Sequence, residues 1–303
     1  MGMTFGIAFW ALIAVSAAAA VAYGTYFLDR PRTWARALVK TTFMGAMTGA
    51  FVVAGAPFPL VLALAAGAAG DFFLAFDKKW TLPLGIVSFL LTQLLYFLIF
   101  AGMWFFSGDN APLEPRYALM LAVAVFTLGV LAWLWRDDLR TNPGSTAATV
   151  FLLFAMGLLL PYFVVITFMP GALSGMFTLL LVAGATPTPP PAPILYAPFA
   201  VLVGAIMLSF LRRDLGSTRL GAMVYAGMIT AMACMAMWMP WAAWPAIAGA
   251  LFFVVSDFVL AAELFRLPSD APARRITAPL VWWTYVAAQV LIVLGIVLAV
   301  FAS

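Results

Sequence analysis

Apolar residues run along this chain in long stretches that charged residues, prolines and glycines interrupt at regular intervals. A bilayer core of about 30 Å requires about 20 apolar residues in one helix. The breaks leave ten stretches of about that length, and we predict a span in each. The predicted spans are 4–27, 34–54, 57–76, 81–106, 116–135, 146–168, 194–211, 218–239, 245–265 and 278–302. The pattern predicts an all-α, polytopic transmembrane helix bundle.

One further apolar segment, 172–184, is short and leads into a proline-rich run at 186–193. We interpret it as an interfacial or re-entrant segment, because an eleventh span would place the later basic loops on the opposite side from the earlier ones. With ten spans, the loops after spans 1, 3, 5, 7 and 9 hold nearly all the loop Lys and Arg residues, and the alternate loops hold only Arg116.

Cytoplasmic loops are enriched in Lys and Arg. We therefore expect an integral protein of a bacterial inner membrane, with both termini outside the cytoplasm. A cleaved signal peptide is not expected, because no Lys or Arg precedes the first apolar run. The net charge of +4 follows from this topology and does not indicate nucleic-acid binding.

Composition narrows the possible chemistry. The chain is 66% hydrophobic and 9% charged, which excludes a soluble cytosolic enzyme. It has no histidine, so a His-ligated metal and a Ser-His-Asp triad are excluded. Its single cysteine, Cys234, excludes an intrachain disulfide. We expect no metal and no cofactor, and chemistry limited to carboxylates, Lys, Tyr, Gln, Ser or Thr.

Two kinds of internal similarity suggest how one transmembrane domain, 1–303, is organised. Gly70-Asp71-Phe72 resembles Ser256-Asp257-Phe258, both spans run in the same direction, and the next span carries a glutamine in each case. This predicts a parallel repeat with halves 1–106 and 194–303. The segment 116–168 is predicted to be an inserted helix pair, because it resembles the hairpin that follows. Chance similarity among abundant Phe, Leu and Ala is the alternative.

Three charged residues lie more than one helical turn from either end of a predicted span: Lys40, Asp71 and Asp257. An ionised side chain costs at least about 2.5–3.5 kcal/mol at mid-helix, so such residues indicate a functional site. At 1.5 Å per residue, all three lie in the cytoplasmic half of the membrane. Neutral polar residues at similar depth are expected to complete one buried pocket that binds substrate. They are Gln93, Tyr96, Tyr225, Ser256, Tyr285 and Gln289.

Simpler interpretations exist for several of these residues. Lys40 can extend to the interface as a snorkelling side chain. The neutral residues can serve as hydrogen-bond partners between helices without any chemistry. Glu263 is expected to be interfacial and solvated. The two aspartates are harder to explain structurally, and we predict that Asp71 and Asp257 are catalytic.

The residues around the two aspartates also match a known family. Span 2 begins near Lys40, span 3 contains Gly70-Asp71, and span 4 contains Phe89 through Tyr96. The stretch from Gly249 to Asp257 is followed by Leu260-Ala261 and by Tyr285-Val286-Ala287-Ala288-Gln289. This pattern resembles the lysoplasmalogenase family of membrane proteins, the YhhN type. The family usually has His where this chain has Gln93, and Pro where it has Thr41.

The resemblance implies hydrolysis of the vinyl ether bond of a lysoplasmalogen, a single-chain lysophospholipid, to a fatty aldehyde and a glycerophospho-base. Two carboxylates suit a reaction that passes through an oxocarbenium ion, as in glycosidases. One must be protonated and the other ionised, and we expect Asp71 to be the ionised one because Lys40 lies at a similar depth. A proton-coupled transporter or lipid translocator using the same carboxylates is the alternative. A binding or scaffold protein is a weaker third.

Overall fold

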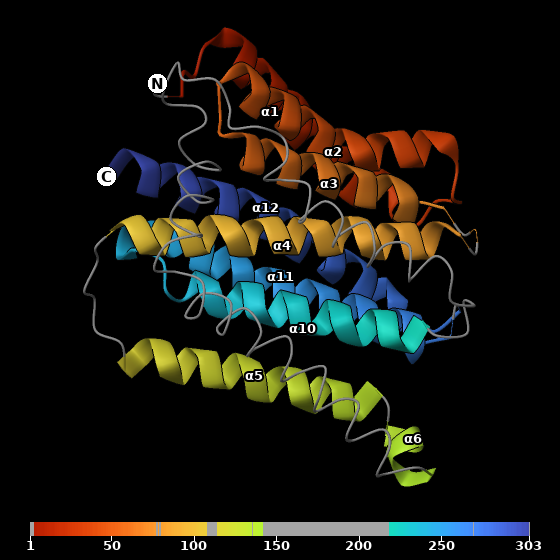
Figure 1. The fold of residues 1–303 in the computed structure, drawn as a ribbon. Coiled ribbons are helices and arrows are strands. Elements are labelled where there is room, and N and C mark those ends of the chain that lie inside the picture. The colour runs from red at the N-terminus through yellow and green to blue at the C-terminus, as the bar shows by residue number, and fades with distance from the viewer. Residues whose placement is uncertain are drawn as a thin grey trace. The chain divides into compact units, whose positions relative to one another are not determined.

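The computed structural model describes residues 3–76, 78, 80–107, 114–134, 136–141, 218–268 and 270–302 (Figure 1). These residues form helices, turns and short connecting segments, and this part of the chain contains no strand. The helices are α1 (Ile7–Ala22), which continues as a π-helix (Tyr23–Phe27), α2 (Trp34–Val53), α3 (Phe58–Leu74), α4 (Thr81–Ser107), α5 (Glu114–Leu134), α6 (Arg136–Thr141), α10 (Thr218–Ala236), α11 (Trp244–Phe265) and α12 (Arg274–Ala302), with a 3-10 turn at Trp241–Ala243.

The all-helical prediction is confirmed for the described residues. In the part of the chain that the structure describes, four helical segments are long and apolar enough to cross a membrane, namely Ile7–Phe27, Thr81–Trp104, Trp241–Phe265 and Arg274–Phe301. The spans predicted at 146–168 and 194–211, and the segment 172–184, lie outside the described residues. The count of ten spans, the repeat and the inserted pair therefore stay predictions.

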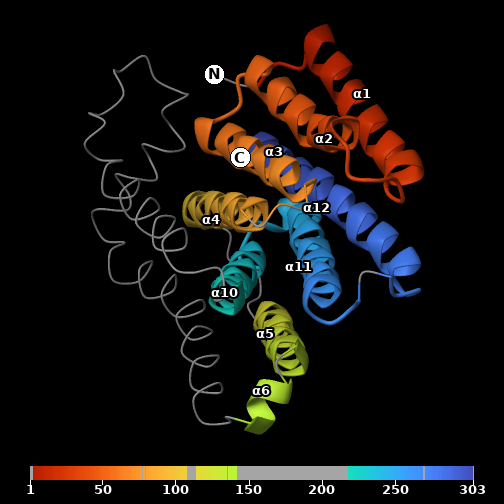
Figure 2. The ribbon, with the colours of Figure 1, turned by 90° about the vertical axis from the view of Figure 1, so that its right-hand side faces the viewer.

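The chain divides into two compact units, which we describe separately. The first contains the described residues up to Ile99 and those from Thr218 to Gly221, and the second contains the described residues from Phe100 to Thr141 and from Ala222 onward. In the first unit α2 lies between α1 and α3 (Figure 2). The Ser16 hydroxyl donates to the Phe43 carbonyl over 2.6 Å and links α1 to α2. Buried Phe43, Met44 and Leu64 fill the core of this unit.

Local signals set the ends of α2, and thereby the position of Lys40. The Thr33 side chain accepts a hydrogen bond from the backbone N–H of Arg36 and caps the N-terminus. At the other end Gly55 has a φ of 73°, and Ala56 N donates to Phe51 O over 2.9 Å. This left-handed glycine closes the helix in a Schellman motif. The chain then turns back into α3, so the start of α2 lies beside the end of α3.

In the second unit α11 packs on α12, and α5 lies next to α10 and α11 (Figure 2). Two glycines allow the α11–α12 contact. A Cβ on Gly249 would lie 2.7 Å from Ile292 N and 2.8 Å from Ala288 O, and a Cβ on Gly295 would overlap Ala246. Small residues of this kind let helix backbones approach closely in membrane proteins.

Large apolar side chains remain on the outside of these helices. Ile7 is 91% exposed, Trp241 is 70% exposed, and Phe58 is 67% exposed. Exposed large apolar side chains in this number are typical of helices that contact lipid or another protein in place of water. Together with the four long apolar helices, it indicates an integral membrane protein.

Candidate functional site

Asp71 forms an ion pair with Lys40 inside the first unit. Lys40 Nζ lies 3.3 Å from Asp71 Oδ1, and the two side chains are 15% and 1% exposed. Lys40 is near the start of α2 and Asp71 near the end of α3, so the antiparallel hairpin brings them together. A cation this close offsets part of the cost of burying a carboxylate. The arrangement holds a charged pair within an apolar helix bundle.

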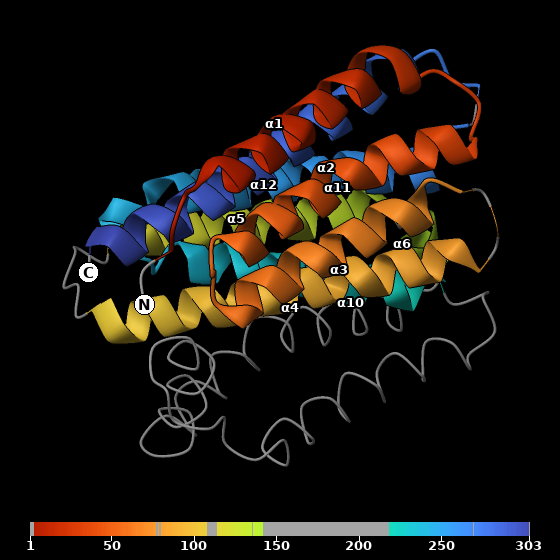
Figure 3. The same cartoon turned by 90° about the horizontal axis from the view of Figure 1, so that it is seen from above.

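The polar residues of α4 follow along the face that packs on α3, and Figure 3 shows these two helices side by side. A Cβ on Gly70 would lie 2.7 Å from the Phe89 ring, and the Thr92 hydroxyl lies 3.3 Å from the carbonyl of Ala63. Gln93 is one helical turn beyond Phe89 on the same face. It lies about 6 Å further along α4 than the level of Gly70 and Asp71.

Gln93 and Tyr96, both sequence-predicted site residues, are fully buried in this unit. The Gln93 amide has no hydrogen-bond partner among the described residues, at either Oε1 or Nε2. Buried polar groups in native proteins are nearly always paired, so each exception calls for an explanation.

Asp257 has a different partner inside the second unit. The Tyr225 hydroxyl, from α10, donates a hydrogen bond to Asp257 Oδ2 on α11. The two aspartates therefore differ in chemistry: one is paired with an ammonium group and the other with a phenol.

The remaining predicted residues of this unit lie on α11 and α12. Ser256 donates to Val281 O over 3.0 Å, so its hydroxyl joins α11 to α12. The Tyr285 ring packs edge-on against Phe253 at 5.7 Å between centroids. Gln289 is buried and occupies the level of Gly249, eight residues before Asp257 along α11. Gln289 thus lies about 12 Å along the helix from the level of Asp257.

The structure assigns the predicted residues to two clusters. Lys40, Asp71, Gln93 and Tyr96 belong to the first unit, and Tyr225, Ser256, Asp257, Tyr285 and Gln289 belong to the second. Among the described residues, no group of three or more Cys, Asp or Glu side chains is placed to hold a metal ion.

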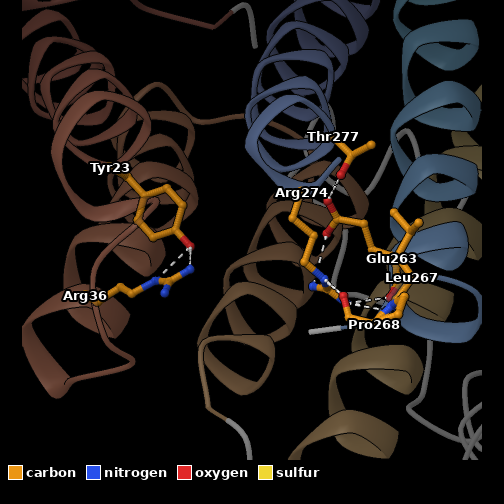
Figure 4. A network of polar contacts seen from close by, with 7 residues as sticks. All are labelled: Tyr23, Arg36, Glu263, Leu267, Pro268, Arg274 and Thr277. Carbon is orange, nitrogen blue, oxygen red and sulfur yellow. Dashed lines mark hydrogen bonds and ion pairs between the residues drawn. The ribbon is translucent and has the colours of Figure 1, made fainter. Parts of the chain in front are cut away.

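The expectation that Glu263 is solvated is wrong. Glu263 is only 7% exposed, because Arg274 and Thr277 from the start of α12 cover it. Thr277 donates to its carboxylate, and an Arg274 nitrogen lies 3.9 Å from Oε2 (Figure 4). The same guanidinium donates to the carbonyls of Glu263, Leu267 and Pro268. The sequence contained a signal for this network, since the acidic Glu263 precedes the α11–α12 connection and the basic Arg274 follows it.

A second network that the sequence did not predict joins α1 to α2. The Arg36 guanidinium donates to the Tyr23 hydroxyl through Nη2 at 3.1 Å and Nε at 3.3 Å (Figure 4). Its Nη1 donates to Arg30 O over 2.6 Å. Tyr23 is the first residue of the π-helix, so the network fixes the end of α1 near the start of α2.

Arg266 links α11 to α5 and α6 at the end of the second unit. Its Nη1 donates to Asp137 Oδ2 over 2.7 Å, and its Nη2 donates to Trp133 O over 2.7 Å. The hydrogen bond and charge of Arg266 lower the pKa of Asp137 below its usual value of 3.8. The contact fixes α6, which follows α5, to the end of α11, the helix that carries Asp257.

Comparison with known proteins places the chain in a family. The model of the YhhN family matches residues 35–186 and 164–296. No curated protein and no solved structure matches. The two matched segments include both aspartates and together extend over most of the sequence. The chain therefore belongs to the YhhN family, which is known for hydrolase activity.

Proposed function

We propose that this protein is a membrane-embedded hydrolase of the lysoplasmalogenase type, which cleaves the vinyl ether bond of a lysoplasmalogen. The observation that carries the proposal is the contrast between its two carboxylates within apolar helices. Asp71 is paired with Lys40, and Asp257 is bound by the Tyr225 hydroxyl. A reaction that needs one acid and one base requires two carboxyl groups in different environments.

The proposed roles follow from these partners. Asp71 acts as the base, since the adjacent Lys40 ammonium favours the carboxylate form. Asp257 acts as the acid, because it has a neutral hydroxyl as its partner and no cation within ion-pair distance among the described residues. Tyr225 orients the Asp257 carboxyl group. Ser256, Tyr285 and Gln289 shape the substrate site around Asp257, and Tyr96 does so on α4.

The reaction proceeds in three steps. Asp257 gives its proton to the second carbon of the alkenyl chain, which produces an oxocarbenium ion at the first carbon. Asp71 takes a proton from water as the water oxygen bonds to that first carbon, giving a hemiacetal. The hemiacetal then collapses: its hydroxyl proton returns to Asp257, Asp71 protonates the departing glycerol oxygen, and a fatty aldehyde leaves. Both carboxyl groups end in their starting forms.

We further propose a bacterial inner membrane location, with both chain ends outside the cytoplasm and Lys40 and Asp71 in the cytoplasmic half. Basic residues at alternate connections along the chain support this orientation. Arg30 lies between α1 and α2, Lys78 between α3 and α4, and Arg274 at the α11–α12 connection. A reporter active only in the cytoplasm should work when inserted beside Lys78 and fail at the C-terminus.

The test is product chemistry on the purified full chain in detergent. Incubation with a lysoplasmalogen should release a fatty aldehyde detectable by mass spectrometry, and lysophospholipids with an ester or saturated ether should release none. Asp71→Asn and Asp257→Asn should each lower the rate by at least about a hundredfold. Full aldehyde release by either variant overturns the catalytic assignment. Binding without turnover favours a proton-coupled transporter or lipid translocator, since an Asp–Lys pair in a span also suits proton relay.

A double variant tests whether the two aspartates serve one reaction. If they do, Asp71→Asn combined with Asp257→Asn should be about as slow as the slower single variant, because groups that act as a unit are not additive. Independent losses that multiply would show that at least one aspartate acts through stability. Thermal unfolding of all three variants provides the control.

A further inference from the structure

The least explained polar group in the described residues is the Gln93 side chain. It is fully buried, and neither Oε1 nor Nε2 has a hydrogen-bond partner within the described chain. Its neighbour Thr92 contrasts with it, because the Thr92 hydroxyl lies 3.1 Å from Ser88 O and 3.3 Å from Ala63 O. A buried amide with both groups unpaired destabilises the ligand-free protein.

The position of this amide relates it to the carboxylate that the proposed reaction uses. Gln93 follows Phe89 by one turn on the face of α4 that packs against α3, and Phe89 covers Gly70. Measured along the axes of the packed helices α3 and α4, the amide therefore lies about one helical turn from Asp71. A ligand that binds Gln93 through one of its groups therefore holds the neighbouring atoms of the same ligand near Asp71.

The chemistry of the amide identifies that group. Oε1 needs a donor and Nε2 needs an acceptor. A hydroxyl supplies both, whereas an ester or ether oxygen only accepts and leaves Oε1 unpaired. We propose that Gln93 binds the free hydroxyl of a single-chain glycerolipid and so selects against lipids substituted at that oxygen.

The identity of the lipid rests on the proposed function, and the chemistry agrees with it. In a lysoplasmalogen the free hydroxyl and the vinyl ether sit on adjacent glycerol carbons. A bound hydroxyl thus holds the reacting bond near the carboxylate. Sites that hydrogen-bond a substrate hydroxyl discriminate strongly against analogues that lack it. We expect the hydroxyl to strengthen binding by at least about tenfold.

Binding of a lipid that the reaction cannot cleave provides the test. The probes are a lysophosphocholine with a saturated ether chain and its analogue methylated at the free hydroxyl. With the full chain in detergent, the hydroxyl lipid should bind at least about tenfold more tightly and raise the Tm further. Gln93→Met, which preserves size and shape, should remove this discrimination and leave the ligand-free Tm equal or higher, because no hydrogen bond is lost.

Thr92→Val is the matched control, since it removes a neighbouring buried hydroxyl whose hydrogen bonds are already made. It should lower the Tm and preserve the discrimination. Equal binding of both probes to the unmodified protein overturns the inference. So does a Gln93→Met variant with lower Tm and intact discrimination, which would assign Gln93 to packing or to a bound water. Aldehyde release without discrimination refutes only this inference, and discrimination without aldehyde release refutes only the proposed reaction.

Discussion

Lys40 Nζ lies 3.3 Å from Asp71 Oδ1, and the pair joins the first turns of α2 to the last turn of α3. The hairpin brings the two side chains together, because α2 and α3 are antiparallel neighbours with these polar residues at their shared end. The side chains are 15% and 1% exposed, so water screens the pair poorly. The ion pair is therefore a structural link, and we propose that it also keeps Asp71 ionised for the reaction.

Removing Lys40 tests both consequences. Lys40→Met leaves the Asp71 carboxylate buried without its cation and should destabilise the protein by about 3–5 kcal/mol. Aldehyde release should fall as well. Adding Asp71→Asn should restore part of the stability and none of the activity, because the buried charge is gone but so is the base. Thermal unfolding and mass spectrometry measure the two effects. Full stability and activity in Lys40→Met would contradict the proposed role of the pair.

Tyr225→Phe tests the hydrogen bond to Asp257. A hydrogen bond to a charged or ionisable group contributes about 1.5–3 kcal/mol. If Tyr225 orients the acid in the transition state, its loss should lower kcat by about tenfold to a hundredfold, with little change in KM. Tyr23→Phe is the matched control, since it removes a phenol hydroxyl that accepts hydrogen bonds from Arg36 in the first unit. A loss of activity in both variants, in proportion to lost stability, would show a packing role for Tyr225.

The sequence predicted individual helices well and contacts between side chains less completely. The helix expected over 34–54 corresponds to α2 at Trp34–Val53, because the apolar run, the Thr33 cap and Gly55 all act locally. Depth along the helices suggested that Lys40 approaches Asp71, since depth is also a local quantity. The burial of Glu263 could not be derived in that way, because it depends on how the start of α12 folds over the end of α11.

The contacts of the site residues also divide into those that depth along a helix predicts and those that depend on how the helices pack. The depth argument placed Gln93 and Asp71 near one another along the membrane normal. In the structure, the Gly70–Phe89 contact puts them about one helical turn apart along the axes of α3 and α4. Depth did not indicate that Tyr225 contacts Asp257 and Ser256 contacts Val281, since these pairings require the rotation of each helix about its axis. The apolar residues are so abundant that they do not define a single buried stripe.

Asp137→Asn tests the ion pair with Arg266 through its pH dependence. Arg266 lowers the pKa of Asp137 below 3.8, so the pair stabilises the folded protein above that pH. The contribution is lost as the pH falls through the lowered pKa. The Tm of Asp137→Asn should therefore lie slightly below that of the unmodified protein near pH 7 and converge with it in acid. The effect should be small because Asp137 is exposed. A Tm difference that stays constant down to pH 3 would exclude the ion pair as its cause.

Gly249→Ala tests whether the close α11–α12 contact supports the site. An added Cβ would lie 2.7 Å from Ile292 N and 2.8 Å from Ala288 O, and these backbone atoms cannot move without separating the helices. The variant should lose about 1–3 kcal/mol of stability. Activity should also fall, because α11 carries Asp257.

Gly129→Ala on α5 is the matched control, since an added Cβ there would meet no atom within 4 Å among the described residues beyond the adjoining turns of its own helix. It should be neutral or more stable, because alanine reduces the conformational entropy of the unfolded chain at no steric cost. The contrast in Tm separates a packing clash from the general effect of replacing glycine in a helix. Equal Tm changes in the two variants would show that α11 and α12 can move apart without penalty, and Asp257 would then need some other element to hold it in place.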